Sequence, residues 1–194
     1  MVELINFGGG NLGSMRRALE RLDVSYRVSS GARDLTGDHG MILPGVGAFG
    51  AAMAGLKRAG LKQRLNEAVR GGSPYLGICI GMQLLFGASE ESPGVAGLGL
   101  IDGEVVRFSA GKVPQIGWNR IEPLSGGSRT PGFVYFVNSY HCRPIDETLA
   151  TYRAEYHIPF CAALRCGNIT AFQFHPERSG PFGHRLLKEW CDDL

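Results

Sequence analysis

The sequence predicts an α/β fold in which a central, mostly parallel sheet is flanked by helices and gains antiparallel strands in the second half. Three observations support this prediction. Short apolar runs alternate with segments of helical periodicity in the first half, strand-like runs follow one another directly from about Glu104, and the chain closes on an amphipathic segment. No linker, repeat or low-complexity tract divides the 194 residues, so we expect a single domain over residues 1–194.

The first half consists of repeated strand–turn–helix units. The apolar run at its start ends in three glycines, after which leucines and a methionine recur at helical spacing. Such alternation is typical of parallel strands joined by covering helices. We expect strands at 2–7, 24–28, 41–44 and 75–78, and helices at 12–22, 61–69 and 81–86.

The second half is rich in short strand-like runs separated by turns. Because no helical segment lies between them, antiparallel pairing is the expected arrangement. Phe182, Leu186, Leu187 and Trp190 then share one face of a closing helix that we expect to pack on the sheet. The expected strands are 104–108, 133–137, 150–156 and 169–174.

Composition excludes several functional classes. The formal charge of +2 is small and the 20 basic residues are scattered, so we expect no nucleic-acid partner. The amino-terminal residues lack the pattern of a signal peptide or a membrane span, which predicts a cytoplasmic protein without a membrane partner. Five cysteines at irregular spacing and dispersed histidines predict neither a disulfide framework nor a metal site, and we expect no cofactor.

A glycine pattern near the amino terminus resembles a dinucleotide-binding loop. Gly8, Gly10 and Gly13 satisfy G-x-G-x-x-G between a strand and a helix. However, no acidic residue stands at the end of the second expected strand, where a ribose would be bound. We therefore favour a tight turn whose glycines permit close packing or positive φ over a nucleotide site.

Cys79 lies between two glycines in the segment Gly77–Gly81, at the junction of an expected strand and helix. This is the form of a nucleophile elbow, in which small residues two positions away prevent clashes around the nucleophile. Backbone N–H groups at a helix start favour the thiolate and can donate to an oxyanion. In isolation, the same pattern is also compatible with a buried cysteine that only packs.

His175 and Glu177 are the expected partners of this thiol. They stand two residues apart after an apolar run, so their side chains would share one face if the strand continued. The glutamate would then orient one imidazole nitrogen while the other accepts the thiol proton. We predict a Cys79–His175–Glu177 triad.

The motifs around these residues resemble the triad-type (class I) glutamine amidotransferases, and among them the glutaminase subunit of imidazole glycerol phosphate synthase. The resemblance implies their α/β fold and covers nearly the whole chain. Its blocks occur in the family's order: NFGGGNLGSM, PGVGAFG, GICIGMQLLF, ESPGVAGLGLIDG, KVPQIGWN, YFVNSY and FQFHPERSG.

This resemblance implies roles for further residues. Cys79 would attack the side-chain amide of L-glutamine, expel ammonia and form a glutamyl thioester that water hydrolyses. An oxyanion hole is expected from Ile80 and the turn Gly45, Val46 and Gly47. The amino and carboxylate groups of the substrate would be bound by Gln83, Glu91, Ser139 and Tyr140.

The resemblance also implies a protein partner. A cyclase subunit in a heterodimer would combine the ammonia with a phosphoribulosyl-formimino intermediate, giving imidazole glycerol phosphate and an aminoimidazole carboxamide ribotide in histidine biosynthesis. Asn11, Trp118 and Arg178 match positions that face this partner. Because hydrolysis without the partner would be wasteful, we expect low activity alone, with a peptide rotation in Gly45–Gly47 as the switch.

Some positions depart from the family pattern and leave the partner synthase open. Histidine is usual or common where this chain has Gln115 and Asn138, leucine is usual at Ile80, and an Asp-Tyr pair is frequent at Asn6 and Phe7. Three alternatives therefore remain: a paralogous glutaminase that feeds another synthase such as a sugar-amidating enzyme, an inactive regulatory module, and an unrelated thiol hydrolase or redox sensor.

Overall fold

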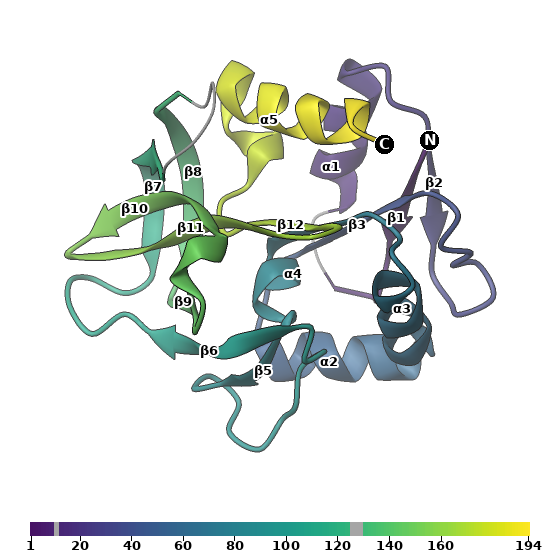
Figure 1. Cartoon of the computed structure of the whole chain (residues 1–194), viewed down its shortest axis with the longest axis horizontal. Helices are drawn as coiled ribbons and strands as arrows, with labels where there is room; N and C mark the ends of the chain where they lie inside the picture. Colours follow the sequence, from purple (N-terminus) through teal and green to yellow (C-terminus); the bar gives the residue numbers. More distant parts are fainter. Residues whose placement is uncertain (10–11, 125–129) are drawn as a thin grey trace.

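A nine-stranded mixed sheet forms the centre of the molecule (Figure 1). The structure is a computed structural model, and it describes residues 1–9, 12–124 and 130–194. The strand order is β2-β1-β3-β4-β12-β11-β10-β7-β8, with parallel pairing from β2 to β12 and antiparallel pairing from β12 to β8. The predicted α/β class, with a parallel first half and added antiparallel strands, is confirmed.

The parallel half of the sheet is built from the first half of the chain and one late strand. Helices connect the first strand to the second and the third to the fourth, as βαβ units require, whereas a loop connects the second strand to the third. The strands are β1 (Val2–Ile5), β2 (Tyr26–Ser29), β3 (Gly40–Gly45), β4 (Tyr75–Cys79) and β12 (Ile169–Phe172). The helices are α1 (Leu12–Arg21), α2 (Phe49–Arg58), α3 (Leu61–Arg70) and the short α4 (Ile80–Gln83).

The strands of the antiparallel half follow one another in the chain, except that the strand between β8 and β10 belongs to a second sheet. That second, three-stranded sheet has the order β5-β6-β9. The strands of the antiparallel half are β7 (Gln115–Pro123), β8 (Gly132–Asn138), β10 (Ala150–Tyr156) and β11 (Ile158–Cys166). The small sheet contains β5 (Phe86–Ser89), β6 (Ile101–Arg107) and β9 (Tyr140–Pro144).

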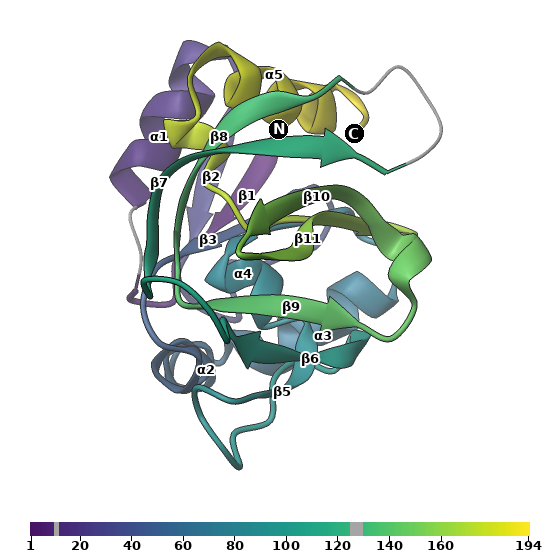
Figure 2. The same cartoon turned by 90° about the vertical axis from the view of Figure 1, so that its left-hand side faces the viewer.

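Helices cover both faces of the parallel strands (Figures 1 and 2). Helix α1 and the closing helix α5 (Gly180–Asp192) lie on one face, where Met15, Leu19, Leu187 and Trp190 pack on the strands. Helices α2 and α3 lie on the other face, in the cluster that contains Phe49. Burial of both faces explains why β1, β3 and β4 are buried along their whole length, whereas the edge strand β2 is not.

The structure corrects several expected elements. The helix expected at 81–86 is a single turn, α4, because the chain enters β5 at Phe86. Helix α2 and strands β5, β7, β9 and β11 were not predicted, and two 3₁₀ turns also occur at Glu147–Leu149 and Pro176–Arg178. Glycines made α2 hard to recognise. A Cβ at Gly55 would lie 2.6 Å from the Phe7 carbonyl oxygen, so the helix can approach the segment after β1 only where it carries no side chain.

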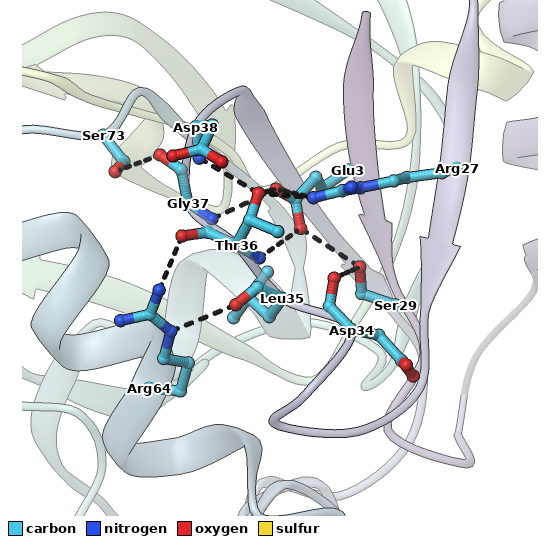
Figure 3. A network of polar contacts seen from close by, with 10 residues as sticks. All are labelled: Glu3, Arg27, Ser29, Asp34, Leu35, Thr36, Gly37, Asp38, Arg64 and Ser73. Atoms are coloured by element: carbon cyan, nitrogen blue, oxygen red, sulfur yellow. Dashed lines mark hydrogen bonds and ion pairs between the residues drawn. The ribbon is translucent and has the colours of Figure 1, made fainter.

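A buried carboxylate organises the connection between β2 and β3 (Figure 3). The side chain of Glu3 is fully buried and accepts hydrogen bonds from Arg27, Ser29, the hydroxyl and amide of Thr36, and the Gly37 amide. Arg64 of α3 donates to the carbonyl oxygens of Leu35 and Thr36. The network therefore ties an irregular loop to both a strand and a helix.

Across the part of the chain that the structure describes, no helix is long and apolar enough to cross a membrane.

Candidate active site

Cys79 occupies a strained turn between β4 and α4. Its φ of 55° and ψ of −106° are unusual for a residue with a side chain. A Cβ at Gly77 would lie 2.5 Å from the Gly81 carbonyl oxygen, and one at Gly81 would lie 1.9 Å from the Leu43 carbonyl oxygen. Both neighbouring glycines are therefore sterically required, as the elbow pattern predicts.

His175 and Glu177 come together, although not by the expected route. Strand β12 ends at Phe172, and Glu177 lies in the 3₁₀ turn Pro176–Arg178, so the strand does not continue through the pair. Nevertheless, the imidazole Nδ1 lies 2.9 Å from Glu177 Oε1, and both side chains are buried. The carboxylate thus accepts from Nδ1–H and leaves Nε2 as the acceptor.

The sheet brings this imidazole to the thiol. Strands β4 and β12 are parallel neighbours, with Ile78 opposite Phe172, so the segments that follow them emerge at the same edge. Nε2 of His175 is buried without a hydrogen-bond partner among the described residues. Burial lowers the pKa of His175, but its interactions with Cys79 and Glu177 raise it by more, so the net pKa lies above the ordinary value.

The turn Gly45–Gly47 lies beside the nucleophile. Gly45 is directly opposite Cys79 in the β3–β4 register, and a Cβ there would come within 2.2 Å of Ile80. Val46 is exposed, and Gly47 has a φ of 113° with open space around its Cα. A glycine with positive φ permits peptide orientations that other residues rarely adopt. The turn is therefore placed where backbone N–H groups could reach an oxyanion on substrate bound to Cys79.

Gln83, Ser139 and Tyr140 are close to one another, beside the elbow. Gln83 Nε2 donates to the Tyr140 carbonyl oxygen at 3.1 Å, and Ser139 forms the bend between β8 and β9. The Val137 carbonyl oxygen, two residues before Ser139, lies 3.9 Å from Cys79 Sγ. These three residues are thus within reach of a substrate held at the thiol.

Glu91 approaches the site from the loop after β5. Its Oε2 accepts a 2.6 Å hydrogen bond from the Phe49 amide, and Ser92 Oγ accepts from the Gly50 amide at 3.0 Å. Both amides belong to the first turn of α2, which directly follows Gly45–Gly47 and whose own N-cap residue, Ala48, offers no side-chain acceptor. The loop therefore caps the helix that follows the expected oxyanion turn.

Two residues of the site were missed from the sequence. Gln173 is fully buried, and its Nε2 lies 3.8 Å from Cys79 Sγ while its Oε1 accepts from Gln83 at 3.2 Å. Ser92 is the other. The signal for Gln173 was present, since a glutamine inside the apolar run FQF is a polar group in a buried strand context.

Trp118 and Arg178 both lie against the ring of Tyr135. The Trp118 and Tyr135 rings are T-shaped with centroids 6.1 Å apart, and the Arg178 guanidinium lies 5.3 Å from the Tyr135 ring. Ile116, Trp118 and Phe133 are all exposed on β7 and β8. We call Ile116, Trp118, Phe133 and Tyr135 the hairpin face. Asn11 lies outside the described residues.

Among residues 1–9, 12–124 and 130–194, no group of three or more histidine, cysteine or acidic side chains is placed to hold a metal ion.

Comparison with known proteins identifies a family. Residues 3–194 match the model of the class-I glutamine amidotransferases. A relative from Deinococcus radiodurans, the imidazole glycerol phosphate synthase subunit HisH, is 43% identical over 202 residues, covering 100% of this chain and 94% of the relative. The HisH subunit of Methanothermobacter thermautotrophicus is 40% identical, covering 99% of this chain and 98% of the relative.

Solved structures share the fold. A glutamine amidotransferase crystal structure superposes with a TM-score of 0.80 at 22% identity, covering 98% of both chains. A chain in the structure of PurLQS from Thermotoga maritima superposes with a TM-score of 0.78 at 17% identity, covering 99% of this chain and 97% of that chain. At these identities, the likeness concerns the fold alone.

Proposed function

Because the chain belongs to the class-I glutamine amidotransferase family and, within it, to the HisH subunits of imidazole glycerol phosphate synthase, we propose that it hydrolyses L-glutamine and delivers the ammonia to a cyclase subunit. The observation that carries this proposal is the arrangement of a strained thiol, an imidazole whose pKa is raised, and a buried carboxylate on that imidazole.

Catalysis begins with proton transfer from Cys79 to His175 Nε2. The raised pKa of His175 favours the imidazolium, which Glu177 stabilises at Nδ1. The thiolate attacks the amide carbon of glutamine, and the imidazolium gives its proton to the departing nitrogen as the C–N bond breaks. Ammonia and a glutamyl thioester result. Water, deprotonated by the neutral imidazole, then cleaves the thioester to glutamate and restores the thiol.

The tetrahedral intermediates carry charge on the former amide oxygen. Backbone N–H groups of Ile80 and of the turn Gly45–Gly47 are proposed to donate to it, because both segments lie beside Cys79. Removal of one such donor typically costs about 3 kcal/mol of transition-state stabilisation. Gln83, Glu91, Ser139 and Tyr140 are proposed to bind the amino acid end of glutamine, where the Glu91 carboxylate suits the substrate ammonium.

The hairpin face is the proposed contact with the cyclase subunit. Clustered exposed aromatic and apolar side chains are typical of interaction surfaces, and tryptophan and arginine are frequent at their centres. Arg178 joins this face directly after the catalytic Glu177. An interface here would place the partner next to the residues that release ammonia.

The test uses the complex with the cyclase subunit. Cys79→Ala should abolish glutamate release while synthesis supported by ammonium chloride continues, because only the nucleophile is removed. Loss of both activities would instead assign Cys79 a structural role. Complementation tests the identity of the partner. This chain should restore growth of a histidine auxotroph that lacks its HisH subunit. If the chain hydrolyses glutamine but does not restore growth, its partner is another synthase.

A further inference from the structure

Gln173 lies beside the sulfur of Cys79, although the proposed triad gives it no role. It directly follows β12 and is fully buried. Its backbone amide donates to the Ala162 carbonyl oxygen at 2.9 Å, and the rings of its two neighbours, Phe172 and Phe174, are stacked with centroids 4.9 Å apart. Buried positions of this kind usually carry apolar side chains, so a carboxamide here requires hydrogen-bond partners.

The hydrogen bonds around Gln173 determine which end of its carboxamide faces the sulfur. Gln83 Nε2 lies 3.1 Å from the Tyr140 carbonyl oxygen and 3.2 Å from Gln173 Oε1. A carbonyl oxygen only accepts hydrogen bonds, so the Gln83 atom in this position must be the NH₂ nitrogen. The Gln173 atom that it meets must then be the oxygen. The NH₂ group of Gln173 therefore faces Cys79 Sγ, at 3.8 Å.

This donor distinguishes the ionised sulfur from the neutral one. The neutral thiol can donate its hydrogen to the Val137 carbonyl oxygen, 3.9 Å away, and accept from Gln173. After ionisation the sulfur only accepts hydrogen bonds, so it gains nothing from the carbonyl oxygen, whereas the bond from the Gln173 amide becomes charge-assisted and stronger. Burial increases the difference, because Cys79 is only 6% exposed and little water can solvate the charge.

We propose that Gln173 is a catalytic hydrogen-bond donor that stabilises the Cys79 thiolate, both before it attacks glutamine and when the thioester is cleaved. This inference rests on the proposed function, because both steps belong to glutamine hydrolysis. In the second step, water loses a proton to His175 and adds to the thioester carbon. The C–S bond then breaks with its electron pair remaining on the sulfur, which regains its proton from His175. The segment 173–175 thus supplies both the base and a donor to the same sulfur.

The first test measures the reactivity of Cys79 in the absence of glutamine. Gln173→Met keeps the length of the side chain but removes the donor. The rate at which iodoacetamide alkylates Cys79 at neutral pH should therefore fall roughly fivefold, the factor of one lost hydrogen bond. Mass spectrometry of the peptide that contains Cys79 follows the reaction and excludes the other four cysteines. An unchanged rate at neutral pH overturns the proposal.

The pH dependence and a control variant separate this role from a structural one. In strongly alkaline solution, where the thiol is ionised in both proteins, the alkylation rates of Gln173→Met and the unchanged protein should converge. A displaced thiol would stay slow at every pH, and that result overturns the proposal. Asn168→Leu is the matched control, because Asn168 is a carboxamide at the other end of β12 that donates to the carbonyl oxygens of Val69 and Ser73. It should lower thermal stability without slowing alkylation, and an equal fall in rate also overturns the proposal.

Steady-state kinetics in the complex with the cyclase subunit test the catalytic consequence. For Gln173→Met, kcat for glutamate release should fall roughly fivefold while KM changes little, because the side chain contacts the reacting sulfur. An unchanged kcat overturns the catalytic role. Alkylation needs no glutamine, so a chain that shows the expected alkylation rates without hydrolysing glutamine contradicts only the proposed function. An active glutaminase with an unchanged alkylation rate overturns only this inference.

Discussion

Backbone strain at Cys79 shows how the nucleophile is presented. A non-glycine residue at a φ of 55° is tolerated because the strand before it and the turn after it are both fixed by packing. The side chain is nevertheless only 6% exposed. The thiol is therefore held in a defined position next to His175 and away from bulk solvent, which strengthens the electrostatic interaction between them.

Glu177→Gln tests how the imidazole is oriented. Glutamine can donate to Nδ1 where glutamate only accepts, which favours the wrong imidazole tautomer, and the loss of the carboxylate removes one contribution that raises the His175 pKa. We expect kcat for glutamate release to fall about 10²- to 10⁴-fold. We also expect an NMR titration of His175 to move to lower pH. A variant with wild-type kcat would remove Glu177 from the triad.

The triad of Cys79, His175 and Glu177 stays a prediction, but its members could be chosen from the sequence, whereas the residues around them could not. Cys79 and His175 stand in local patterns whose chemistry is readable without coordinates. Gln173 could have been noticed as a polar residue in an apolar run, but its contact with Cys79 joins positions 94 apart in the chain. Ser92 acts on a helix 42 positions away and leaves no local signal. The expected common strand face for His175 and Glu177 was wrong, because Pro176 begins a 3₁₀ turn between them.

At the level of elements, helix α2 depends on a distant loop for its amino-terminal hydrogen bonds. Ala48 supplies none, and Glu91 and Ser92 supply one each. Because α2 starts directly after the turn Gly45–Gly47, this cap also fixes one end of that turn. If Glu91 binds the substrate ammonium as proposed, substrate binding would also affect the position of the proposed oxyanion donors in Gly45–Gly47.

Ser92→Ala separates capping from substrate contact. Loss of the hydroxyl should lower the free energy of unfolding by about 1 kcal/mol, the usual contribution of a cap. Because the turn beside Cys79 loses its support, kcat should fall severalfold while KM changes little, and Ser92→Thr should restore both. Steady-state kinetics with chemical denaturation measure these effects; a rise confined to KM would contradict the positioning role.

Glu3 performs a comparable task for the β2–β3 connection. Burial alone would raise the pKa of this carboxyl, but hydrogen bonds from Thr36, Arg27, Ser29 and Gly37 lower it overall. A lowered pKa in the folded state means that the ionised carboxylate contributes stability above pH of about 4.5. That contribution is lost as pH falls through the folded-state pKa.

Glu3→Gln should therefore destabilise the protein in a pH-dependent way. At neutral pH we expect the free energy of unfolding to drop by roughly 3 kcal/mol, because Arg27 loses its partner and several donors lose an ionised acceptor. The difference between variant and unchanged protein should shrink as pH falls below about 4.5. Denaturation curves across pH measure it; a constant difference would contradict the proposed ionised state.

The accuracy of element prediction followed the clarity of the local pattern. The sequence predicted strands β1, β2, β3, β4, β6, β8, β10 and β12 and helices α1, α3 and α5, because their periodicity or apolar content is local. Strands β7 and β11 carry glycine, proline or charged residues and become strands through partners far along the chain. The helix at 81–86 was overextended because its apolar residues fill core positions in two different elements.

At the scale of the whole molecule, the parallel and antiparallel parts of the large sheet meet at β12. This strand pairs in parallel with β4 and antiparallel with β11, and the chain that follows it supplies His175. The parallel half thus contains Cys79 and the turn Gly45–Gly47, while the antiparallel half contains the hairpin face on which a partner is proposed to bind. Cys79 and the proposed partner surface therefore come from strands on opposite sides of β12 in the sheet order.

Trp118→Ala tests this division. Truncation of an exposed aromatic at the centre of an interface typically costs about 2 kcal/mol of binding free energy or more, so affinity for the cyclase subunit should fall roughly 30-fold. Stability of the isolated chain should hardly change, since the ring is largely exposed. Ile145→Ala, which is also exposed but lies directly after β9, is the control. Unchanged affinity would place the interface elsewhere.

Tyr135 connects the proposed partner surface to the segment that contains His175. Its backbone oxygen accepts from the His175 amide at 3.0 Å, its backbone amide donates to Ser179 Oγ at 2.9 Å, and its ring lies in the hairpin face. A rigid-body tilt of the β7–β8 hairpin would therefore also move the segment that contains His175 and Ser179, without any rearrangement of the buried core. A movement of the hairpin on docking would therefore reach the residue that carries the imidazole directly, through the hydrogen bond from the His175 amide.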